Sequence, residues 1–322
     1  MILAIDQGST KTQALIGDRT GRVLGTGMAG GACHFMVGVN KSMEMVWAAA
    51  EAAMENAGVK AGCIDTVSAG MAGANWPDEF QLLKTNLQKL FPSAEISVYN
   101  DVVPALYAGT GCPDAIILCA GSSFNAAVLK DRKLEWIFNN YIEARDDGGK
   151  SLSEIAMEGI FRAENCMGPA TSLRERAMEF FGYTEILPML LDFSRKCMKI
   201  PVKDFATVVD EEAMKGDAVA LDAQYRFGKS VSRYAVGALK RFDLLGRPTD
   251  IVLSGGIFKA RSSVMTDAIR TEVHRVAPLA RIVEAYKEPI VGAYELALDP
   301  ETVRANSALI GEMVEKFGLY RR

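Results

Sequence analysis

A carboxylate and a small polar loop follow one another at the start of the chain. Residues 2–5 are apolar, and they are followed by Asp6 and then by Gly8, Ser9, Thr10 and Lys11. The backbone N–H groups and hydroxyls of such a loop can bind an anion such as phosphate. Asp6 would repel a bare phosphate, but it could face a hydrated magnesium ion lying between the two. The structural alternative is a capped hairpin, in which Asp6 accepts hydrogen bonds from nearby backbone N–H groups.

The same pattern occurs a second time in the chain. The two segments that align without a gap are residues 4–19 (AIDQGSTKTQALIGDR) and 117–132 (ILCAGSSFNAAVLKDR). Gly121 and Ser122 take the places of the first glycine and serine, and Ser123 follows. Because the Gly-Ser step and the Asp-Arg turn keep one register, we interpret the chain as a duplicated domain. Two such loops would face each other at a cleft and grip phosphates from both sides.

Asp101 is a candidate general base. The segment ISVYNDVVPALYAG reads as a strand that ends on Asn100 and Asp101 and continues into an Ala-rich helix. Side chains at the carboxyl ends of strands in α/β sheets lie where ligands bind. A carboxylate there could take the proton from an attacking hydroxyl. Asp101 could equally be the N-cap of the helix, and the local sequence leaves both readings open.

Three further positions are candidates. Gly255 and Gly256 follow a strand in DIVLSGGIFKA, where they could let a flat ring lie against the backbone or could serve a tight turn, the commoner reason for Gly-Gly. His34 is one of two histidines, and a lone histidine is more often a structural hydrogen-bonding residue than a catalyst. Asp146, in EARDDGGKS, precedes Gly-Gly and an expected helix, so it belongs to a solvated turn or lies near the same cleft.

The elements that must position these residues form two similar sets. Strands are expected at 2–5, 13–16 and 22–26, a helix at 42–56, and strands at 63–68 and 95–99 around a second helix. A second set of three strands at 115–119, 125–129 and 134–138 precedes mostly helical sequence and strands at 251–253 and 282–284. Strands followed by alternating helices and strands, twice over, predict an α/β fold with two domains.

The predicted boundaries follow from this order. The N-terminal domain spans residues 1–105, and the C-terminal domain spans 106–300 with a helical insertion at about 151–245. A C-terminal helical segment at 301–322 could pack back on the first domain or mediate a homodimer.

Composition excludes several classes of function. The net charge of −4 argues against a nucleic-acid partner, and no run of Lys or Arg suggests a membrane surface. The six cysteines lie far apart, which with two histidines argues against a zinc site and suits a reducing compartment. The start of the chain lacks the basic segment of a signal peptide, so we expect a soluble cytoplasmic protein.

Taken in order, the segments DQGSTKT, YNDVVPA, CAGSS, RDDGG, LSGGIF and EPIVGAYELAL resemble the sugar-kinase, actin and heat-shock-chaperone ATPase superfamily. Within it the chain, from residue 2 to about 298, is most similar to the BadF/BadG/BcrA/BcrD-type ATPases, particularly their N-acetylglucosamine kinase-like branch. The resemblance implies two ribonuclease-H-like (actin-like ATPase) domains that close on ATP and Mg2+ in an interdomain cleft.

The resemblance also implies roles by position. Asp6 would help to hold magnesium, Asp101 would activate a sugar hydroxyl, Asp146 would face the sugar or the metal, and His34 lies in a sugar-contacting segment. The expected phosphate-binding residues are Gly8, Ser9, Thr10, Lys11, Gly121, Ser122 and Ser123, with Gly255 and Gly256 near adenosine.

The chain departs from the family pattern in places. The second loop is usually Gly-Thr-Gly-Ser, whereas residues 120–123 here are Ala-Gly-Ser-Ser, and two sugar-contacting segments, at 33–35 and 139–141, also differ. The expected function is ATP-dependent phosphorylation of a sugar or amino-sugar hydroxyl, as in N-acetylglucosamine or glucosamine kinases. One alternative is a non-kinase ATPase that drives a conformational change in a partner protein. The other is a nucleotide- or sugar-binding module that has lost its chemistry.

Overall fold

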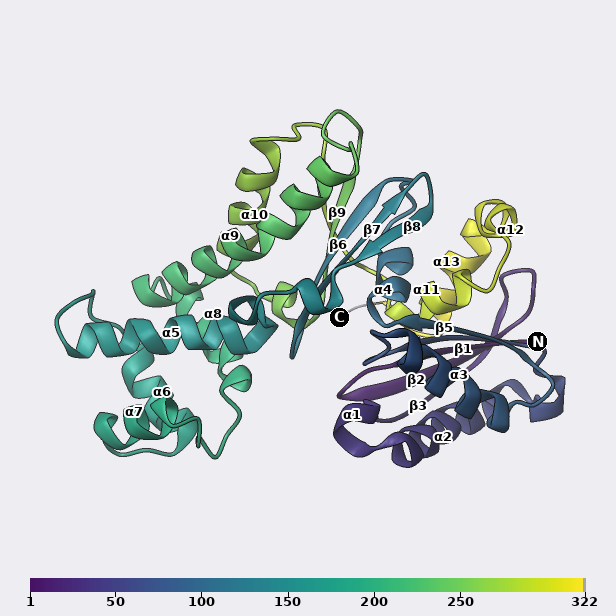
Figure 1. The fold of residues 1–322 in the computed structure, drawn as a ribbon, viewed down its shortest axis with the longest axis horizontal. Helices are drawn as coiled ribbons and strands as arrows, with labels where there is room; N and C mark the ends of the chain where they lie inside the picture. Colours follow the sequence, from purple (N-terminus) through teal and green to yellow (C-terminus); the bar gives the residue numbers. More distant parts are fainter. Residues whose placement is uncertain (321–322) are drawn as a thin grey trace. The chain divides into compact units, whose positions relative to one another are not determined.

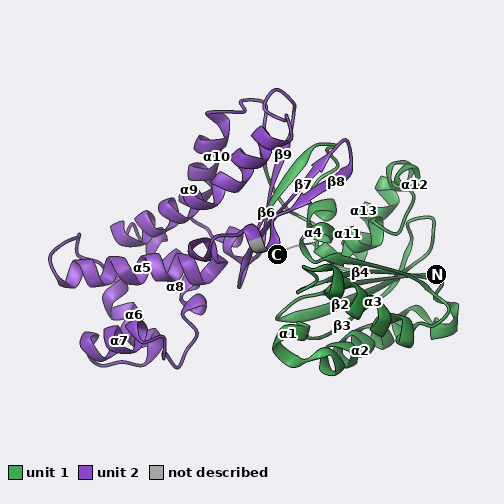
Figure 2. Cartoon of the chain, viewed as in Figure 1, with its two compact units in different colours: residues 1–117, 283–322 green, residues 118–282 purple. Residues whose placement is uncertain are grey.

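The computed structural model describes residues 1–320, apart from the side chain of Asn140. The chain forms two five-stranded sheets with helices around them, which confirms the predicted α/β fold (Figure 1). It divides into two compact units (Figure 2). Unit 1 consists of Met1–Ile117 with Val283–Arg322, and unit 2 is Leu118–Ile282.

The sheet of unit 1 has the strand order β3-β2-β1-β4-β5. Its strands are β1 (Ile2–Gln7), β2 (Lys11–Gly17), β3 (Val23–Gly30), β4 (Thr66–Met71) and β5 (Glu95–Asn100). β1 runs antiparallel to β2 and parallel to β4, and β4 runs parallel to β5. The carboxyl ends of β1, β4 and β5 therefore lie at one edge of the sheet.

Strand β1 is apolar along its length because both of its faces are covered. Ile2 and Ala4 belong to a core with α11 and α13, whereas Leu3 and Ile5 belong to a second core with α2 and α3. Alternate side chains of a strand point to opposite faces, so a doubly covered strand carries a continuous apolar run. The helices of unit 1 are α1 (His34–Val37), α2 (Val39–Ala57), α3 (Pro77–Leu90), α4 (Val102–Gly109), α11 (Pro289–Glu295), α12 (Pro300–Ala305) and α13 (Ser307–Lys316).

The glycines of β3 serve helix packing. A Cβ atom added at Gly25 would lie 2.6 Å from the Ala53 carbonyl oxygen, and one added at Gly27 would lie 2.2 Å from that of Ala49. Both alanines belong to α2, so the two glycines let the helix backbone approach the strand. This packing explains the G-x-G-x-x-G pattern of residues 25–30 without a nucleotide.

The sheet of unit 2 repeats the topology of the first, with the order β10-β9-β6-β7-β8. Its strands are β6 (Ala115–Ala120), β7 (Phe124–Lys130), β8 (Lys133–Ile137), β9 (Asp250–Ser254) and β10 (Arg281–Glu284). The bounds of β6 and β7 match those of β1 and β2 at a constant offset of 113 residues. The topology and the register agree with the predicted duplication.

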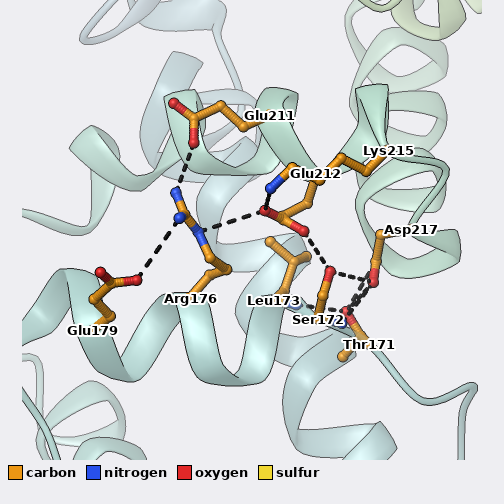
Figure 3. Close-up of polar contacts among 9 residues, drawn as sticks. All are labelled: Thr171, Ser172, Leu173, Arg176, Glu179, Glu211, Glu212, Lys215 and Asp217. Carbon is orange, nitrogen blue, oxygen red and sulfur yellow. Dashed lines mark hydrogen bonds and ion pairs between the residues drawn. The ribbon is translucent and has the colours of Figure 1, made fainter.

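The expected helical insertion contains a series of helices. They are α5 (Gly148–Glu164), α6 (Leu173–Phe181), α7 (Ile186–Ser194), α8 (Ala206–Met214) and α9 (Ala218–Arg241), and α10 (Val264–His274) follows β9. A polar network joins three of them (Figure 3). Asp217 caps α9 by accepting from the N–H groups of Val219 and Ala220. The Ser172 hydroxyl, at the start of α6, donates to Glu212 of α8 at 2.5 Å and to Asp217 at 3.1 Å.

The limits of the compact units differ from the boundaries expected near residues 105 and 300. The division falls within β6 and β10, so α11 belongs to unit 1, where it packs against α4 and β1. The segment expected to form one C-terminal helix is divided at Asn306 between α12 and α13. Across the described residues, no helix has both the length and the apolar character needed to cross a membrane.

Candidate functional site

Two carboxylates meet at the carboxyl edge of the unit 1 sheet. Asp6 lies near the end of β1 and is 8% exposed, and Asp101 directly follows β5. Burial raises the pKa of Asp6 to about 7, with a further increase from the charge of Asp101 and a decrease from Lys11. The parallel register of β1, β4 and β5 brings the two acids together, because these strands end at the same level.

Asp101 occupies the N-cap position of α4 without the usual side-chain cap. Its backbone is already helical, with φ −57° and ψ −24°, and its side chain makes no N-cap hydrogen bond. The Val102 N–H donates instead to Asn100 Oδ1 at 3.1 Å. Burial raises the pKa of Asp101 to about 6, although nearby backbone N–H groups act in the opposite direction. The carboxylate can therefore accept a proton near neutral pH, as a general base must.

The first loop is a closed turn whose lysine is already paired. The Gly8 N–H donates to the Lys11 carbonyl at 2.9 Å, and Ser9 and Thr10 are exposed. Lys11 Nζ lies 2.6 Å from Glu288 Oε2, and the Glu288 side chain is 14% exposed. Glu288 immediately precedes α11 and was missed by the sequence analysis, although it lies within the EPIVGAYELAL segment.

His34 is buried without hydrogen-bond partners. It begins α1, is 7% exposed, and neither ring nitrogen is hydrogen-bonded to a described residue. Its ring lies against Phe35, with 4.2 Å between centroids, and a Cβ atom added at Gly73 would come within 2.8 Å of its Cε1. Burial raises the pKa of the adjacent Cys33 thiol, with a contribution from Asp101, so this segment lies near the candidate base. Buried polar groups are normally paired, so these unsatisfied nitrogens mark His34 as a candidate polar contact, although neighbouring atoms cover both nitrogens in this conformation.

Asp146 is buried within unit 2 and hydrogen-bonded to a helix. It ends the 3-10 helix η3 (Ala144–Asp146) and is 0% exposed. Its carboxylate accepts from Ser230 Oγ at 2.5 Å, Arg233 Nη2 at 2.8 Å and the Tyr234 hydroxyl at 2.9 Å. All three donors lie on α9, so the carboxylate anchors η3 to that helix.

The second loop lies against the start of a long helix in unit 2. The Gly121 N–H donates to the Ser123 carbonyl, and the Gly149 N–H donates to the Gly121 carbonyl, both at 2.9 Å. Gly148 has φ +53°, and a Cβ atom there would come within 2.6 Å of the Gly121 carbonyl oxygen. Glycine at the start of α5 is thus required for contact with the loop.

Lys203 is a second residue that the sequence analysis missed. It lies in η4 (Val202–Phe205), and its Nζ donates to Ser122 Oγ at 3.4 Å. Lys203 and Ser122 are 81 residues apart, so no local sequence pattern could have indicated their contact.

The Gly255-Gly256 turn meets the same loop. Gly255 has φ +97°, and a Cβ atom added there would lie 2.0 Å from the Ala120 carbonyl oxygen. At Gly256, by contrast, an added Cβ atom would have no described atom within 4 Å. The first glycine therefore serves tight packing, whereas the second leaves an open backbone surface. Loop 121–123, the start of α5 and this turn converge, offering N–H groups and hydroxyls beside the Lys203 ammonium group.

The acids of unit 1 fit a hydrated magnesium ion. The described residues contain no group of three or more His, Cys, Asp or Glu side chains that could enclose a metal. Mg2+ commonly keeps several waters and takes only one or two carboxylates with substrate phosphates. The raised pKa of Asp6 reflects a buried carboxylate next to a second acid, an arrangement that a divalent cation would stabilise.

Comparisons with known proteins agree with this architecture. A family model described as the BadF/BadG/BcrA/BcrD ATPase family matches residues 3–297. A proposed N-acetylglucosamine kinase from Porphyromonas gingivalis has a similar structure, with a TM-score of 0.69 and 17% identity over 95% of this chain and 100% of that one. A second proposed N-acetylglucosamine kinase, from Chromobacterium violaceum, has a TM-score of 0.66 and 18% identity over 92% of this chain and 98% of that one.

A ROK family glucokinase from Streptomyces griseus, solved with glucose and AMPPNP, is also similar. Its TM-score is 0.61, with 19% identity over 92% of this chain and 98% of that one. Comparison with curated proteins gives no significant match. At these identities the structural similarity establishes the two-domain sugar-kinase fold.

Proposed function

Because the chain belongs to the BadF/BadG/BcrA/BcrD ATPase family, we propose that it is an ATP-dependent kinase that phosphorylates a hydroxyl of a sugar or amino sugar. The observation that carries this proposal is the set of groups around Asp101. It combines a carboxylate whose pKa is raised to about 6 with Asp6 and with the segment of Cys33 and His34. The His34 ring nitrogens have no hydrogen-bond partner among the described residues. A general base, a metal ligand and a polar contact for substrate are what this reaction requires.

On the acceptor side, Asp101 takes the proton of the attacking hydroxyl. The hydroxyl oxygen forms a bond to the γ-phosphorus while the bond from that phosphorus to the β,γ-bridging oxygen breaks, and ADP leaves with that electron pair. His34 orients the sugar by hydrogen bonding to a second polar group of the substrate. Gly73 packs against the His34 ring, and its lack of a side chain leaves space for that ring.

On the nucleotide side, each loop is suited by itself to bind phosphate oxygens through backbone N–H groups and hydroxyls, those of Ser9 and Thr10 in unit 1 and those of Ser122 and Ser123 in unit 2. Asp6 would hold the magnesium ion, which supplies neutralisation of phosphate charge when bound. The open backbone at Gly256 would accept the adenosine. The fold similarity to a glucokinase solved with glucose and AMPPNP supports this assignment.

A second candidate function is ATP hydrolysis coupled to a partner protein. The description of the matching family as ATPases favours it. In that case Asp101 would orient a water molecule, and a sugar would not change the rate of ADP release.

One assay separates these functions. The full chain is incubated with ATP, magnesium and a panel of hexoses and amino sugars, ADP release is followed in a coupled assay, and products are identified by mass spectrometry. We expect ADP release that depends on one sugar, with one phosphosugar formed per ADP. Sugar-independent ADP release would favour the second function, and the absence of ATP binding by calorimetry would exclude both.

A further inference from the structure

A lysine in the helical part of unit 2 forms no ion pair with a carboxylate of residues 1–320. We propose that Lys203, rather than Lys11 of the first loop, supplies the positive charge that binds the nucleotide phosphates. This inference rests on the proposed function, because it assigns a residue to the nucleotide site of that function.

The position of Lys203 is fixed by its own element. Phe205, two residues further on, is 0% exposed, and its ring lies 5.6 Å from that of Phe180 and 5.2 Å from that of Phe181. The Asp204 N–H donates to the Pro201 carbonyl at 3.0 Å. On its other side the Lys203 carbonyl oxygen lies 3.0 Å from where a Gly149 Cβ atom would be, so η4 packs closely on α5. The backbone at Lys203 is therefore held beside the second loop.

The surroundings of its ammonium group favour an anion. Lys203 Nζ contacts a hydroxyl, that of Ser122 at 3.4 Å, and among the described residues no carboxylate forms an ion pair with it. The adjacent helix α5 is 17 residues long and begins at this point, which adds the positive end of its dipole. An ammonium group on a flexible stem, beside a hydroxyl and without an ion-pair partner among the described residues, is suited to binding phosphate.

Lys11 has the opposite surroundings. Its Nζ is 2.6 Å from Glu288 Oε2, and Asp6 is close enough for Lys11 to lower the pKa of that carboxyl group. A phosphate approaching Lys11 would therefore meet two acids, and the lysine would have to leave Glu288 first. We assign Lys11 to positioning its loop against the segment before α11, and Lys203 to binding.

The test compares nucleotide binding by calorimetry in the full chain, with ATP, ADP and adenosine as probes. We expect Lys203→Gln to weaken ATP binding by roughly tenfold or more, ADP binding less, and adenosine binding by less than about twofold. Lys203→Arg should retain most of the ATP affinity. Lys11→Gln should weaken ATP binding less than Lys203→Gln does.

Lys240→Gln is the matched control, because Lys240 is an exposed lysine near the end of α9 in the same unit. It should bind ATP as the unmodified chain does, and thermal unfolding should show that all variants fold. ATP binding by the unmodified chain with no loss in Lys203→Gln, or an equal loss in Lys203→Gln and Lys240→Gln, would overturn this inference alone. An unmodified chain that binds no ATP would overturn the proposed function as well.

Discussion

The two loops of the duplicated hairpins keep the same backbone register but carry different charges. At the common offset of 113 residues, Gly8 corresponds to Gly121, whereas Asp6 corresponds to Cys119 and Lys11 to Phe124. The first loop lies among Asp6, Lys11 and Glu288, of which the lysine and the glutamate form an ion pair. The second loop has lost both charged positions of the repeat, and its cation, Lys203, comes from the helical insertion.

The comparison shows that the two copies share their backbone geometry but not their charged residues. The strand–loop–strand register survived duplication because it is set by the sheet, in which a slip of one residue would reverse every side chain. The charges were free to diverge. The first copy concentrates acids that suit a metal and a proton acceptor, and the second retains glycines and hydroxyls that suit phosphate.

The largest expected effect is on turnover. It concerns the acidic region, which comprises Asp6, Asp101 and Glu288, and not the glycine-rich region, which comprises residues 121–123, 148–149 and 255–256. Asp101→Asn should lower kcat by roughly a hundred- to ten-thousandfold while ATP binding and folding are retained, because only the proton acceptor is removed. Steady-state kinetics with the sugar found in the panel would measure it. Asp78→Asn, at an exposed position of α3, is the control and should leave kcat unchanged. Near-normal turnover of the Asp101 variant would contradict its role as the base.

The second prediction concerns the backbone of the glycine-rich region. Gly255→Ala should lower the free energy of unfolding by roughly 2 kcal/mol or more, because it combines a positive φ with a Cβ atom 2.0 Å from the Ala120 oxygen. Gly256→Ala, with open space around the added methyl group, should change stability by less than about 0.5 kcal/mol. Denaturant unfolding of the two variants would measure the difference, and equal stabilities would refute the packing role of Gly255.

The third prediction is a pH dependence that belongs to the acidic region. Asp101 has its pKa raised from 3.8 to about 6, so the carboxylate needed for proton transfer is lost as the pH falls through 6. We expect kcat/KM to fall by about tenfold per pH unit below this value. Stability should change in the opposite direction: the raised pKa favours the folded state at low pH, and this advantage is lost as the pH rises from about 4 to 6.

Thermal unfolding of Asp101→Asn over the same range provides the comparison. The variant lacks the titrating group, so its stability should fall less than that of the unmodified chain as the pH rises. Parallel profiles for the two proteins would show that Asp101 does not titrate in this window.

The smallest expected effect tests how Glu288 restrains the first loop. Glu288→Gln removes the partner of Lys11, and because the lysine is 41% exposed, the loss of stability should be at most about 1 kcal/mol. The released lysine should strengthen ATP binding by roughly two- to fivefold. Calorimetry would measure this, and weaker ATP binding would show that the ion pair supports the binding conformation of the loop.

Much of this arrangement could be predicted from local pattern. The run of apolar residues in β1, its acid and its glycine, and the repeat 113 residues later carry enough information to place the sheets and loops. The strand ending at Asp101 also predicted that this carboxylate lies at the edge where β1 and β4 end, whereas only the structure shows that Asp101, at the N-cap position, makes no side-chain cap hydrogen bond. Local sequence determines strand periodicity and turns, and for these features the sequence-based expectations agree with the structure.

Long-range packing decided the rest. Lys203 and Glu288 meet their loops from positions 81 and 277 residues away, and no periodicity within either segment indicates this. Asp146 had the expected sequence neighbours, yet Ser230, Arg233 and Tyr234 of α9 saturate its carboxylate. Gly25 and Gly27 likewise serve the approach of α2, a helix more than ten residues further along the chain.

The contribution of α11 and α13 to unit 1 has a consequence for synthesis. Ile2, Ala4 and Leu15 are covered by side chains of residues 290–319, which are made after the whole of unit 2. Unit 2 is continuous in sequence, so it can complete its core while one face of the earlier sheet is still uncovered on the ribosome. The half of the protein that leaves the ribosome first is therefore the half that finishes folding last, and until then its apolar face is open to aggregation or to a chaperone.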